Sequence, residues 1–432
     1  MTTSPPQPQT GATAYPRRAT LLVTTTLAAL AMIGPFTIDT VFPGFEAIGR
    51  DYEVDATALQ QITSIYLISF AVMSVFHGPI SDALGRKPVM IGGLLGYVVA
   101  SVVCALAPSF GVLLAARVMQ GLFAGAATIV SRAVIRDLFS GAEAQKLMAR
   151  VMMIFAIAPA IAPVIGGEIL RFGPWHWIFW FVAAYGIAAA VLTAVVLPET
   201  HPPERRSSLR VGSVLGSLWG VARSGRFERL AFSAAFVFAS YFLYVVAAPI
   251  IVVDLLGRGE QDFWMLFVPM IGGMVTGSML TNRLAERVDP GPMVDVTMVV
   301  LLGGTLVNVV LCWLAPDLPW AVVGPALMGV AIGVAFPVQQ LAMLDLFPEA
   351  RGAAASMASF AALVFNALLA GVVSPLVTGT LLTAALTSAL FAVVGAALWV
   401  WHRRATSQTA TGAPTPASAD LPTGGAASAD AG

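Results

Sequence analysis

The amino-acid sequence predicts an all-α membrane protein with twelve transmembrane helices in two six-helix bundles. Of its 432 residues, 58% are hydrophobic and only 11% are charged, whereas about a quarter of an average soluble domain is charged. Twelve apolar runs reach the roughly 20 residues that a helix needs to cross a bilayer. These runs are apolar on every side and do not alternate with polar residues, which excludes a β-barrel.

The order of the runs predicts two similar halves. The predicted spans are residues 20–43, 57–79, 89–107, 110–134, 147–170 and 175–197, followed by 229–253, 262–282, 292–314, 319–342, 352–374 and 379–401. The predicted domains are a cytoplasmic N-terminal tail (1–19), an N-terminal six-helix bundle (20–197), a cytoplasmic linker (198–228), a C-terminal six-helix bundle (229–402) and a disordered cytoplasmic tail (403–432). Two related bundles with a path between them are typical of transporters built from internal repeats.

The basic residues orient the predicted spans. Nineteen of the 23 Lys and Arg residues fall on one side, and only Arg50, Arg171 and Arg258 fall on the other. Because cytoplasmic loops are enriched in basic residues, we expect both termini to be cytoplasmic. The first apolar run is too long for the core of a signal peptide, so we expect it to remain as the first helix.

Composition also excludes several classes of function. The 23 basic and 23 acidic residues balance, so no basic excess is available to bind nucleic acid. Cys104 and Cys312 are too far apart and too few for a disulfide framework or a cysteine metal site. The four histidines are scattered, and no nucleotide, zinc or dinucleotide motif occurs. We therefore expect neither an enzyme nor a metal or cofactor protein.

Two charged residues lie inside predicted spans and are candidates for proton coupling. Asp39 lies in the outer part of the first span, and Arg117 lies about seven residues into the fourth. A charge near the middle of a membrane costs roughly 2.5–3.5 kcal/mol by insertion scales, which marks a functional candidate. Asp39 can exchange a proton, unless it is a helix-end carboxylate among lipid headgroups. Arg117 stays charged, and it either tunes a carboxylate or clamps backbone carbonyls.

Three motifs accompany these charges. The loop after the second span reads GPISDALGRK from Gly78 to Lys87, with Asp82, Gly85 and Arg86 at fixed spacing, and residues 282–287 hold a degenerate copy. The fourth span holds Arg117-Val-Met-Gln120-Gly121. The fifth span has small residues at 158, 162 and 166, prolines including Pro163, and the pair Gly166-Gly167. Such small residues let a second helix approach closely, and prolines bend a helix.

The loop resembles the G-x-x-x-D-x-x-G-R-[RK] signature of the major facilitator superfamily. The fourth-span element resembles that superfamily's R-x-x-Q-G motif, and the fifth-span run resembles its G-P-x-x-G-G antiporter motif, with Ala162 in the first glycine position. More narrowly, Asp39-x-x-x-Pro43, residues 48–51 and residues 131–139 resemble the Bcr/CflA branch of drug:proton antiporters. The resemblance implies a monomer with the major facilitator fold.

The resemblance also implies roles for particular residues. Asp39 would exchange proton and substrate, with Arg117 modulating it. The gating set would hold the inner face closed in the outward-facing state, with Asp82 meeting the start of helix eleven; this set comprises Gly78, Asp82, Gly85, Arg86, Asp137, Pro163, Gly166 and Gly167. The central cavity would draw on Phe36, Tyr66, Gln120, Phe155, Tyr241, Gln340 and Asn366. The alternative for each aromatic residue is that it faces lipid or the interface.

The expected function is export of small amphipathic antibiotics in exchange for protons across the inner membrane of a bacterium. The branch exports amphenicols, bicyclomycin and fluoroquinolones. The Arg-rich composition, with only Lys87 and Lys146 as lysines, suggests a high-GC bacterium and makes chloramphenicol the leading candidate. Ala31 stands where some related exporters have a second acid, so permanent cations are less favoured. The alternatives are a metabolite exporter or importer of the same fold, and a membrane sensor that transports nothing.

Overall fold

The computed structural model describes residues 17–139, 141–206, 211–284, 287–347 and 350–411. Its long helices are α1 (Arg17–Asp39), α3 (Ala56–Leu84), α4 (Arg86–Ala105), α5 (Phe110–Leu138), α6 (Gly141–Phe172), α7 (His176–Val196), α9 (Gly225–Val246), α10 (Trp264–Leu284), α11 (Pro290–Leu314), α12 (Trp320–Asp345), α13 (Arg351–Leu368) and α15 (Leu381–Thr411). Short helices are α2 (Phe45–Tyr52), α8 (Val211–Ala222) and α14 (Ser374–Val377), with 3-10 turns η1 (Phe42–Gly44) and η2 (Pro203–Arg205) and π-helices η3 (Ile250–Leu255) and η5 (Leu369–Val373). No strand occurs within these ranges.

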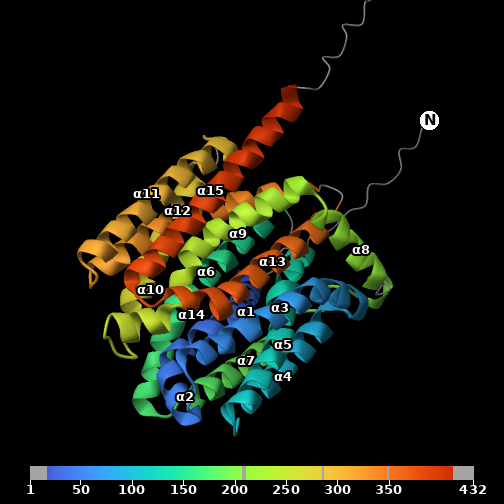
Figure 1. The fold of residues 1–432 in the computed structure, drawn as a ribbon. Coiled ribbons are helices and arrows are strands. Elements are labelled where there is room, and N and C mark those ends of the chain that lie inside the picture. Colours follow the sequence, from blue (N-terminus) through green and yellow to red (C-terminus); the bar gives the residue numbers. More distant parts are fainter. Residues whose placement is uncertain (1–16, 140, 207–210, 285–286, 348–349, 412–432) are drawn as a thin grey trace, which may run out of the picture.

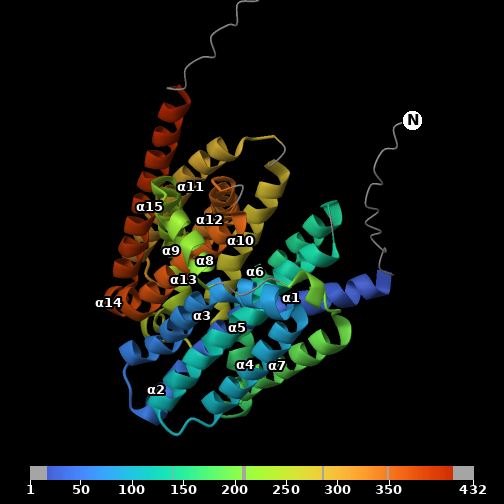
Figure 2. The ribbon, with the colours of Figure 1, turned by 90° about the vertical axis from the view of Figure 1, so that its right-hand side faces the viewer.

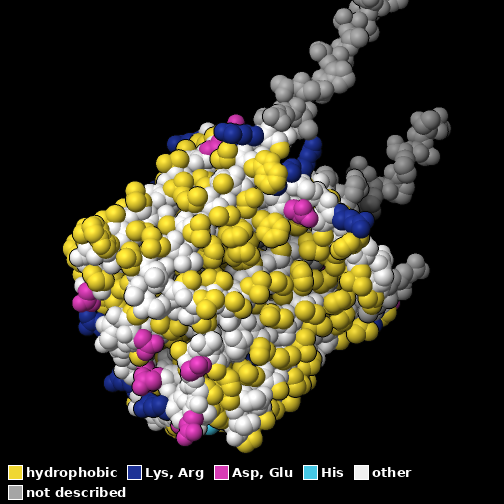
Figure 3. Space-filling view, viewed as in Figure 1, with side chains coloured by type: hydrophobic (Ala, Val, Ile, Leu, Met, Phe, Trp, Pro, Cys, Tyr) yellow, Lys and Arg dark blue, Asp and Glu magenta, His cyan; other side chains and the backbone are white. Residues whose placement is uncertain are grey.

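The prediction of an all-helical, multi-pass membrane protein is confirmed. Among the described residues, eleven helical stretches are long and apolar enough to cross a membrane. The remaining predicted run, 147–170, lies within α6, a helix of 32 residues. Charged side chains gather at two opposite ends of the molecule, and a hydrophobic band lies between them (Figure 3).

The two charged ends carry both signs of charge in different proportions. We call one the acidic end, which carries Glu46, Glu53, Asp254 and Glu260 near α2 and η3. We call the other the basic end, which carries Arg86, Lys87, Arg206 and Arg403. In Figure 1 the described chain ends at the top with α15, which carries Arg403, whereas α2 lies at the bottom.

Each half packs mainly on itself. Helices α1, α3, α4, α5, α6 and α7 contact one another, and α9, α10, α11, α12, α13 and α15 form the second group. Figure 2 shows the first half below and the second half above and to the left. The halves meet where α3 packs against α13 and η5, and where α6 packs against α10. There, Ser64 Oγ donates to the Ala367 carbonyl at 2.9 Å and Gln61 Nε2 donates to the Gly371 carbonyl at 3.0 Å.

The structure adds detail to three predicted segments. The linker region 198–228 contains α8, a 12-residue helix that exposes Leu215 and Trp219. Helix α15 continues to Thr411, so the first nine residues of the predicted disordered tail are helical, and the remainder lies outside the described residues. The first span ends at Asp39, and η1 and α2 follow it at the acidic end.

Candidate transport site

Asp39 is the last residue of α1 and is only 3% exposed. No ion pair joins it to Arg117 in the part of the chain that the structure describes. Its carboxyl group lies instead within electrostatic reach of the phenols of Tyr66 and Tyr241. Tyr66 belongs to α3 in the first half, and Tyr241 belongs to α9 in the second. The predicted proton carrier therefore lies within electrostatic reach of both halves.

Arg117 is fully buried and holds the backbone of two neighbouring helices. Its Nη1 donates to the Thr37 carbonyl of α1 at 3.0 Å, and its Nε donates to the Ile62 carbonyl of α3 at 3.0 Å. The guanidinium carbon lies 4.8 Å from the centre of the Tyr66 ring. Arg117 therefore has the geometry of a clamp on backbone carbonyls, which was one of its two predicted roles; the other was to tune a carboxylate.

Gln120 completes the Arg117 site from one turn further along α5. Its Oε1 accepts from Arg117 Nη1 at 2.9 Å, and its Nε2 donates to Ser101 Oγ at 2.8 Å. All three side chains are fully buried. Gln120 was predicted to contact substrate, but in this conformation it orients Arg117 inside the first half.

Phe36 also packs within the first half. It is 5% exposed and forms an apolar cluster with Ala158 and Ala162 of α6. Its ring stacks on Tyr185 with centroids 5.3 Å apart. Phe36 therefore occupies the small-residue face of α6, where the sequence predicted close helix approach. The side chain of Phe155, another predicted contact, lies outside the described part of the structure.

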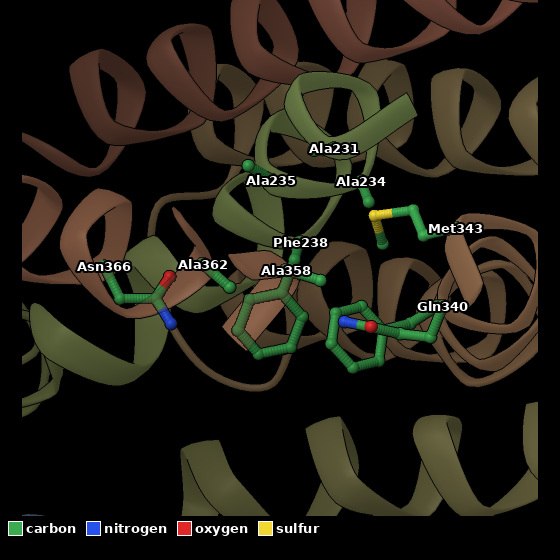
Figure 4. A pocket seen from close by; sticks show the side chains of 10 residues that line it. Ala231, Ala234, Ala235, Phe238, Gln340, Met343, Ala358, Ala362 and Asn366 are labelled. Carbon is green, nitrogen blue, oxygen red and sulfur yellow. The ribbon is translucent and has the colours of Figure 1, made fainter. Parts of the chain in front are cut away.

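Two of the predicted pocket residues line one narrow cavity. Gln340 of α12 and Asn366 of α13 lie on either side of the Phe238 ring of α9 (Figure 4). The cavity volume is about 10 Å³, which is room for one water molecule. Tyr241 packs beside Phe238, with ring centroids 6.4 Å apart. A drug-sized ligand would require this region to widen.

Phe238 was not singled out from the sequence. It lies in a helix with many aromatic residues, so no local signal separates it from rings that face lipid. Its position between Gln340 and Asn366 depends on how α9, α12 and α13 pack together, which the sequence does not indicate.

The signature loop forms a charged cluster at the basic end. Arg86 Nη1 lies 2.5 Å from Asp82 Oδ1, and Arg86 Nε lies 3.2 Å from Asp137 Oδ2. Arg86 also donates to Ser81 Oγ at 2.6 Å. The three predicted gating charges are thus brought together. The side chain of Arg351, where α13 begins, lies outside the described part, so the predicted contact of Asp82 with helix eleven stays a prediction.

The two glycines of this loop have different surroundings. Gly85 has φ of +103°, a backbone conformation that favours glycine. A methyl group at Gly85 would lie 2.8 Å from Arg206 Nη2 and 2.8 Å from Glu199 Oε2. A methyl group at Gly78 would meet nothing within 4 Å. The structure therefore explains a requirement for glycine at position 85 but not at 78.

Glu199 joins the cluster, although it was not predicted. Its carboxylate accepts the backbone N–H of Arg86 at 3.0 Å and of Lys87 at 3.2 Å. These are the first residues of α4, whose N-terminal N–H groups have no partner within the helix. The available signal was a lone acid between Pro198 and Thr200 at the end of the sixth span, but the contact bridges more than a hundred residues.

The glycine pair of α6 lies at the acidic end, against both neighbouring segments. A methyl group on Gly166 would collide with the carbonyl oxygen of Thr40, one residue after Asp39. A methyl group on Gly167 would lie 2.6 Å from the carbonyl oxygen of Glu260 in the second half. Pro163 is buried one turn earlier. The antiporter-like motif thus packs directly on the chain that follows Asp39.

Comparison with known proteins gives one family. The model of the Major Facilitator Superfamily matches residues 24–368. The chain is 30% identical over 284 residues to the bicyclomycin resistance protein homolog of Haemophilus influenzae, covering 66% of this chain and 71% of that protein. It is 27% identical over 328 residues to the multidrug resistance protein MdtL of Escherichia coli, covering 76% and 82%.

Solved structures show the same fold at lower identity. The human organic anion transporter MFSD10 (TETRAN) matches with a TM-score of 0.65 and 21% identity, covering 89% of this chain and 99% of that one. A bacterial homolog of the human lysosomal transporter Spinster, in an inward-facing and unoccupied conformation, matches with a TM-score of 0.68 and 15% identity, covering 90% and 97%.

Proposed function

The chain belongs to the major facilitator superfamily, and from this premise we propose that it exports small amphipathic antibiotics in exchange for protons. Its relatives include a bicyclomycin resistance protein homolog and a multidrug resistance protein, which supports drug efflux. The proposed location is the inner membrane of a bacterium, with the basic end in the cytoplasm as the positive-inside rule requires. Chloramphenicol and other amphenicols are the leading substrates.

The observation that carries the proton-coupled mechanism is the position of Asp39. A carboxylate that is 3% exposed and lacks a described ion pair is costly to keep charged. It lies within electrostatic reach of Tyr66 in one half and Tyr241 in the other. Movement of the halves would change the exposure of Asp39, so protonation and conformation would be coupled.

The narrow cavity beside Phe238 is the proposed drug site in a contracted state. It holds about 10 Å³ between Gln340 and Asn366 and is lined by α9, α12 and α13 of the second half, so a drug could enter only after these three helices move apart. Both amides can hydrogen-bond a neutral polar group, and the surrounding side chains are mostly apolar. Such a site favours a neutral amphipathic ligand.

The free energy released by one entering proton is sufficient to drive export of a neutral drug against a large concentration gradient. A proton moving inward through ~100 mV supplies about 2.3 kcal/mol, and one pH unit adds about 1.4 kcal/mol. A total near 4 kcal/mol sustains roughly a thousandfold gradient of a neutral compound.

The test is drug susceptibility of an efflux-deficient bacterium that expresses the wild type, Asp39→Asn or Asp55→Asn at equal membrane levels. The panel contains chloramphenicol, florfenicol, bicyclomycin, a fluoroquinolone, tetracycline and ethidium. Asp55 caps α3 through a 2.7 Å bond from Ala58 N, and Asn caps as well as Asp, so Asp55→Asn is the matched control. Resistance should appear with the wild type and the control and disappear with Asp39→Asn.

A second measurement separates transport from coupling. In liposomes containing purified protein, Asp39→Asn should still exchange labelled chloramphenicol down its gradient but should not concentrate it when a pH gradient is imposed. Uphill transport at the wild-type rate by Asp39→Asn would refute proton exchange at this residue. A net accumulation of compound in cells would indicate an importer, and no effect on any compound would favour a metabolite transporter or a sensor.

A further inference from the structure

A second cavity lies at the acidic end, between the two halves. Its volume is about 320 Å³, within the range of small-molecule sites. One wall comes from η1, α2 and the beginning of α3, and the other comes from Pro249 to Asp254 around η3. We call this cavity the outer cleft. It is separate from the narrow cavity beside Phe238, which shares no lining residue with it.

The walls of the outer cleft combine apolar surface with negative charge. Phe42, Phe45 and Val253 contribute apolar surface, and Glu46 and Asp254 are its two acidic residues. Glu46 also acts electrostatically on Asp254, and burial together with this nearby charge raises the pKa of Asp254. The two carboxylates therefore disfavour each other's negative charge, and a cation between them would relieve that repulsion.

The basic side chain at the cleft does not neutralise this charge. Arg50 Nη2 lies 3.9 Å from Glu46 Oε1, and both side chains are at least half exposed. Exposed pairs of this kind contribute little. Glu260 adds a further carboxylate nearby, because Glu46 and Arg50 both act on it. Arg50 and Glu260 are thus the charged neighbours that the structure gives to Glu46 besides Asp254.

Gln60 supplies an independent sign of a ligand. It is 1% exposed and lines the outer cleft, yet neither its amide oxygen nor its amide nitrogen has a hydrogen-bond partner among the described residues. A buried unsatisfied amide costs roughly 1–3 kcal/mol. Both amide atoms have almost no exposed surface, so the oxygen can accept an N–H from a bound molecule only after the side chain turns toward the cleft.

We propose that the outer cleft binds a small amphipathic amine, with its ammonium group between Glu46 and Asp254 and its apolar part against Phe42 and Phe45. On binding, the Gln60 side chain turns toward the cleft and its amide oxygen accepts one ammonium N–H. A bare metal ion fits less well, because no group of three metal-ligating side chains occurs among the described residues. The site is distinct from Asp39 and does not depend on transport.

The test uses binding of radiolabelled phenethylamine to the purified full-length protein in lipid nanodiscs, near neutral pH where the amine is charged. Saturable binding should be displaced by unlabelled phenethylamine, whereas 2-phenylethanol, a neutral molecule of nearly the same shape, should not compete at tenfold higher concentration. Glu46→Gln combined with Asp254→Asn should weaken binding at least about tenfold, which corresponds to about 1.4 kcal/mol. Gln60→Leu should weaken it as well.

Matched variants make the result specific. Glu53→Gln removes an exposed acid one residue after α2, outside the lining of the cleft, and should leave binding unchanged. Asp39→Asn should retain saturable binding even where it shifts the balance between conformations, which separates this site from the proposed transport site. Val253→Phe retains every charge but fills the cleft, so it should abolish binding even if the charge variants lose stability.

Three outcomes would overturn the proposal. They are the absence of saturable binding to the wild type, equal competition by 2-phenylethanol, and loss of binding in Asp39→Asn with retention in Val253→Phe. The last outcome would place the amine at the central site. Because the assay measures binding without a proton gradient, its failure would leave the drug susceptibility test of the proposed function unaffected.

Discussion

Arg117 donates a hydrogen bond from Nη1 to the carbonyl oxygen of Thr37 at 3.0 Å, two residues before the buried Asp39. The guanidinium therefore binds the backbone of α1 near Asp39, and it forms no described ion pair with the Asp39 carboxylate itself. This arrangement fixes the end of α1 against α5 while the carboxylate remains free to change its protonation. A clamp and a proton carrier are then separate parts of one site.

The Arg117→Lys variant tests the clamp. Lysine retains the charge but not the planar fork, so it cannot satisfy the carbonyls of both Thr37 and Ile62. We expect the free energy of unfolding to fall by roughly 2–4 kcal/mol, since hydrogen bonds to charged groups contribute about 1.5–3 kcal/mol each. Thermal unfolding in detergent measures this. Wild-type stability with altered proton coupling would instead assign Arg117 to charge tuning.

Alanine substitutions at the two glycines of the signature loop should have different effects on stability. Gly85→Ala places a methyl group beside Glu199 and Arg206 at a residue with φ of +103°, so we expect a loss of about 1–3 kcal/mol in stability and reduced transport. Gly78→Ala meets open space within a helix, so we expect no loss and a gain of up to about 1 kcal/mol. Equal sensitivity at both positions would contradict the structure.

Glu199 is predicted to stabilise the start of α4. Glu199→Gln removes the negative charge that faces the N–H groups of Arg86 and Lys87. Acids at helix N-termini contribute about 0.3–1 kcal/mol at exposed sites and up to about 2 kcal/mol when partly buried. We expect a loss within that range by chemical denaturation, with Glu204→Gln, an exposed acid in the same linker, as the unaffected control. A larger effect at Glu204 would argue against capping by Glu199.

The acidic end should respond to pH with a defined sign. Burial, and secondly the charge of Glu46, raise the pKa of Asp254 from 3.8 and of Glu260 from 4.5, while Arg50 opposes the shift at Glu260. Groups whose pKa is raised by folding add stability below their ordinary pKa, and this stability is lost as pH rises through the raised value. Glu46→Gln should therefore raise the Tm near neutral pH, with the gain shrinking toward about pH 4.

The control for this pH dependence is Glu53→Gln, which removes an exposed acid of the same end that acts on neither carboxyl group. Its Tm should follow that of the wild type at every pH. A gain for Glu46→Gln that is the same at pH 4 and pH 7 would show that loss of the Glu46 charge is not the cause.

Most of the fold was predictable from the sequence because a bilayer allows few solutions. Runs of about 20 apolar residues must be helices, and charges inside such runs are rare enough to mark Asp39 and Arg117. Helix α8 was missed because its 12 residues are too short to span a membrane and lie between basic segments. The apolar composition of α8 resembles that of a helix buried in a protein core. Only the structure shows that α8 is largely exposed.

The partners of the site residues were less predictable. Arg117 donates to the backbone carbonyl oxygens of Thr37 and Ile62. Because every residue has a backbone carbonyl, the sequence does not indicate which of them the guanidinium contacts. Phe36 and Gln120 were expected in a cavity but pack inside the first half. Which face of an all-apolar helix points to a cavity depends on helix rotation, and periodicity does not determine rotation when every face is hydrophobic.

The last prediction concerns the contact between Gly166 of α6 and the carbonyl oxygen of Thr40. Gly166→Ala introduces a collision there, and the chain after Asp39 must shift to relieve it. Because overpacking costs typically 1–3 kcal/mol, we expect lower thermal stability together with altered drug efflux at equal expression. Gly272→Ala in α10 meets open space and should behave as the wild type. Unchanged stability and efflux in Gly166→Ala would show that the close approach of Gly166 to Thr40 is needed for neither.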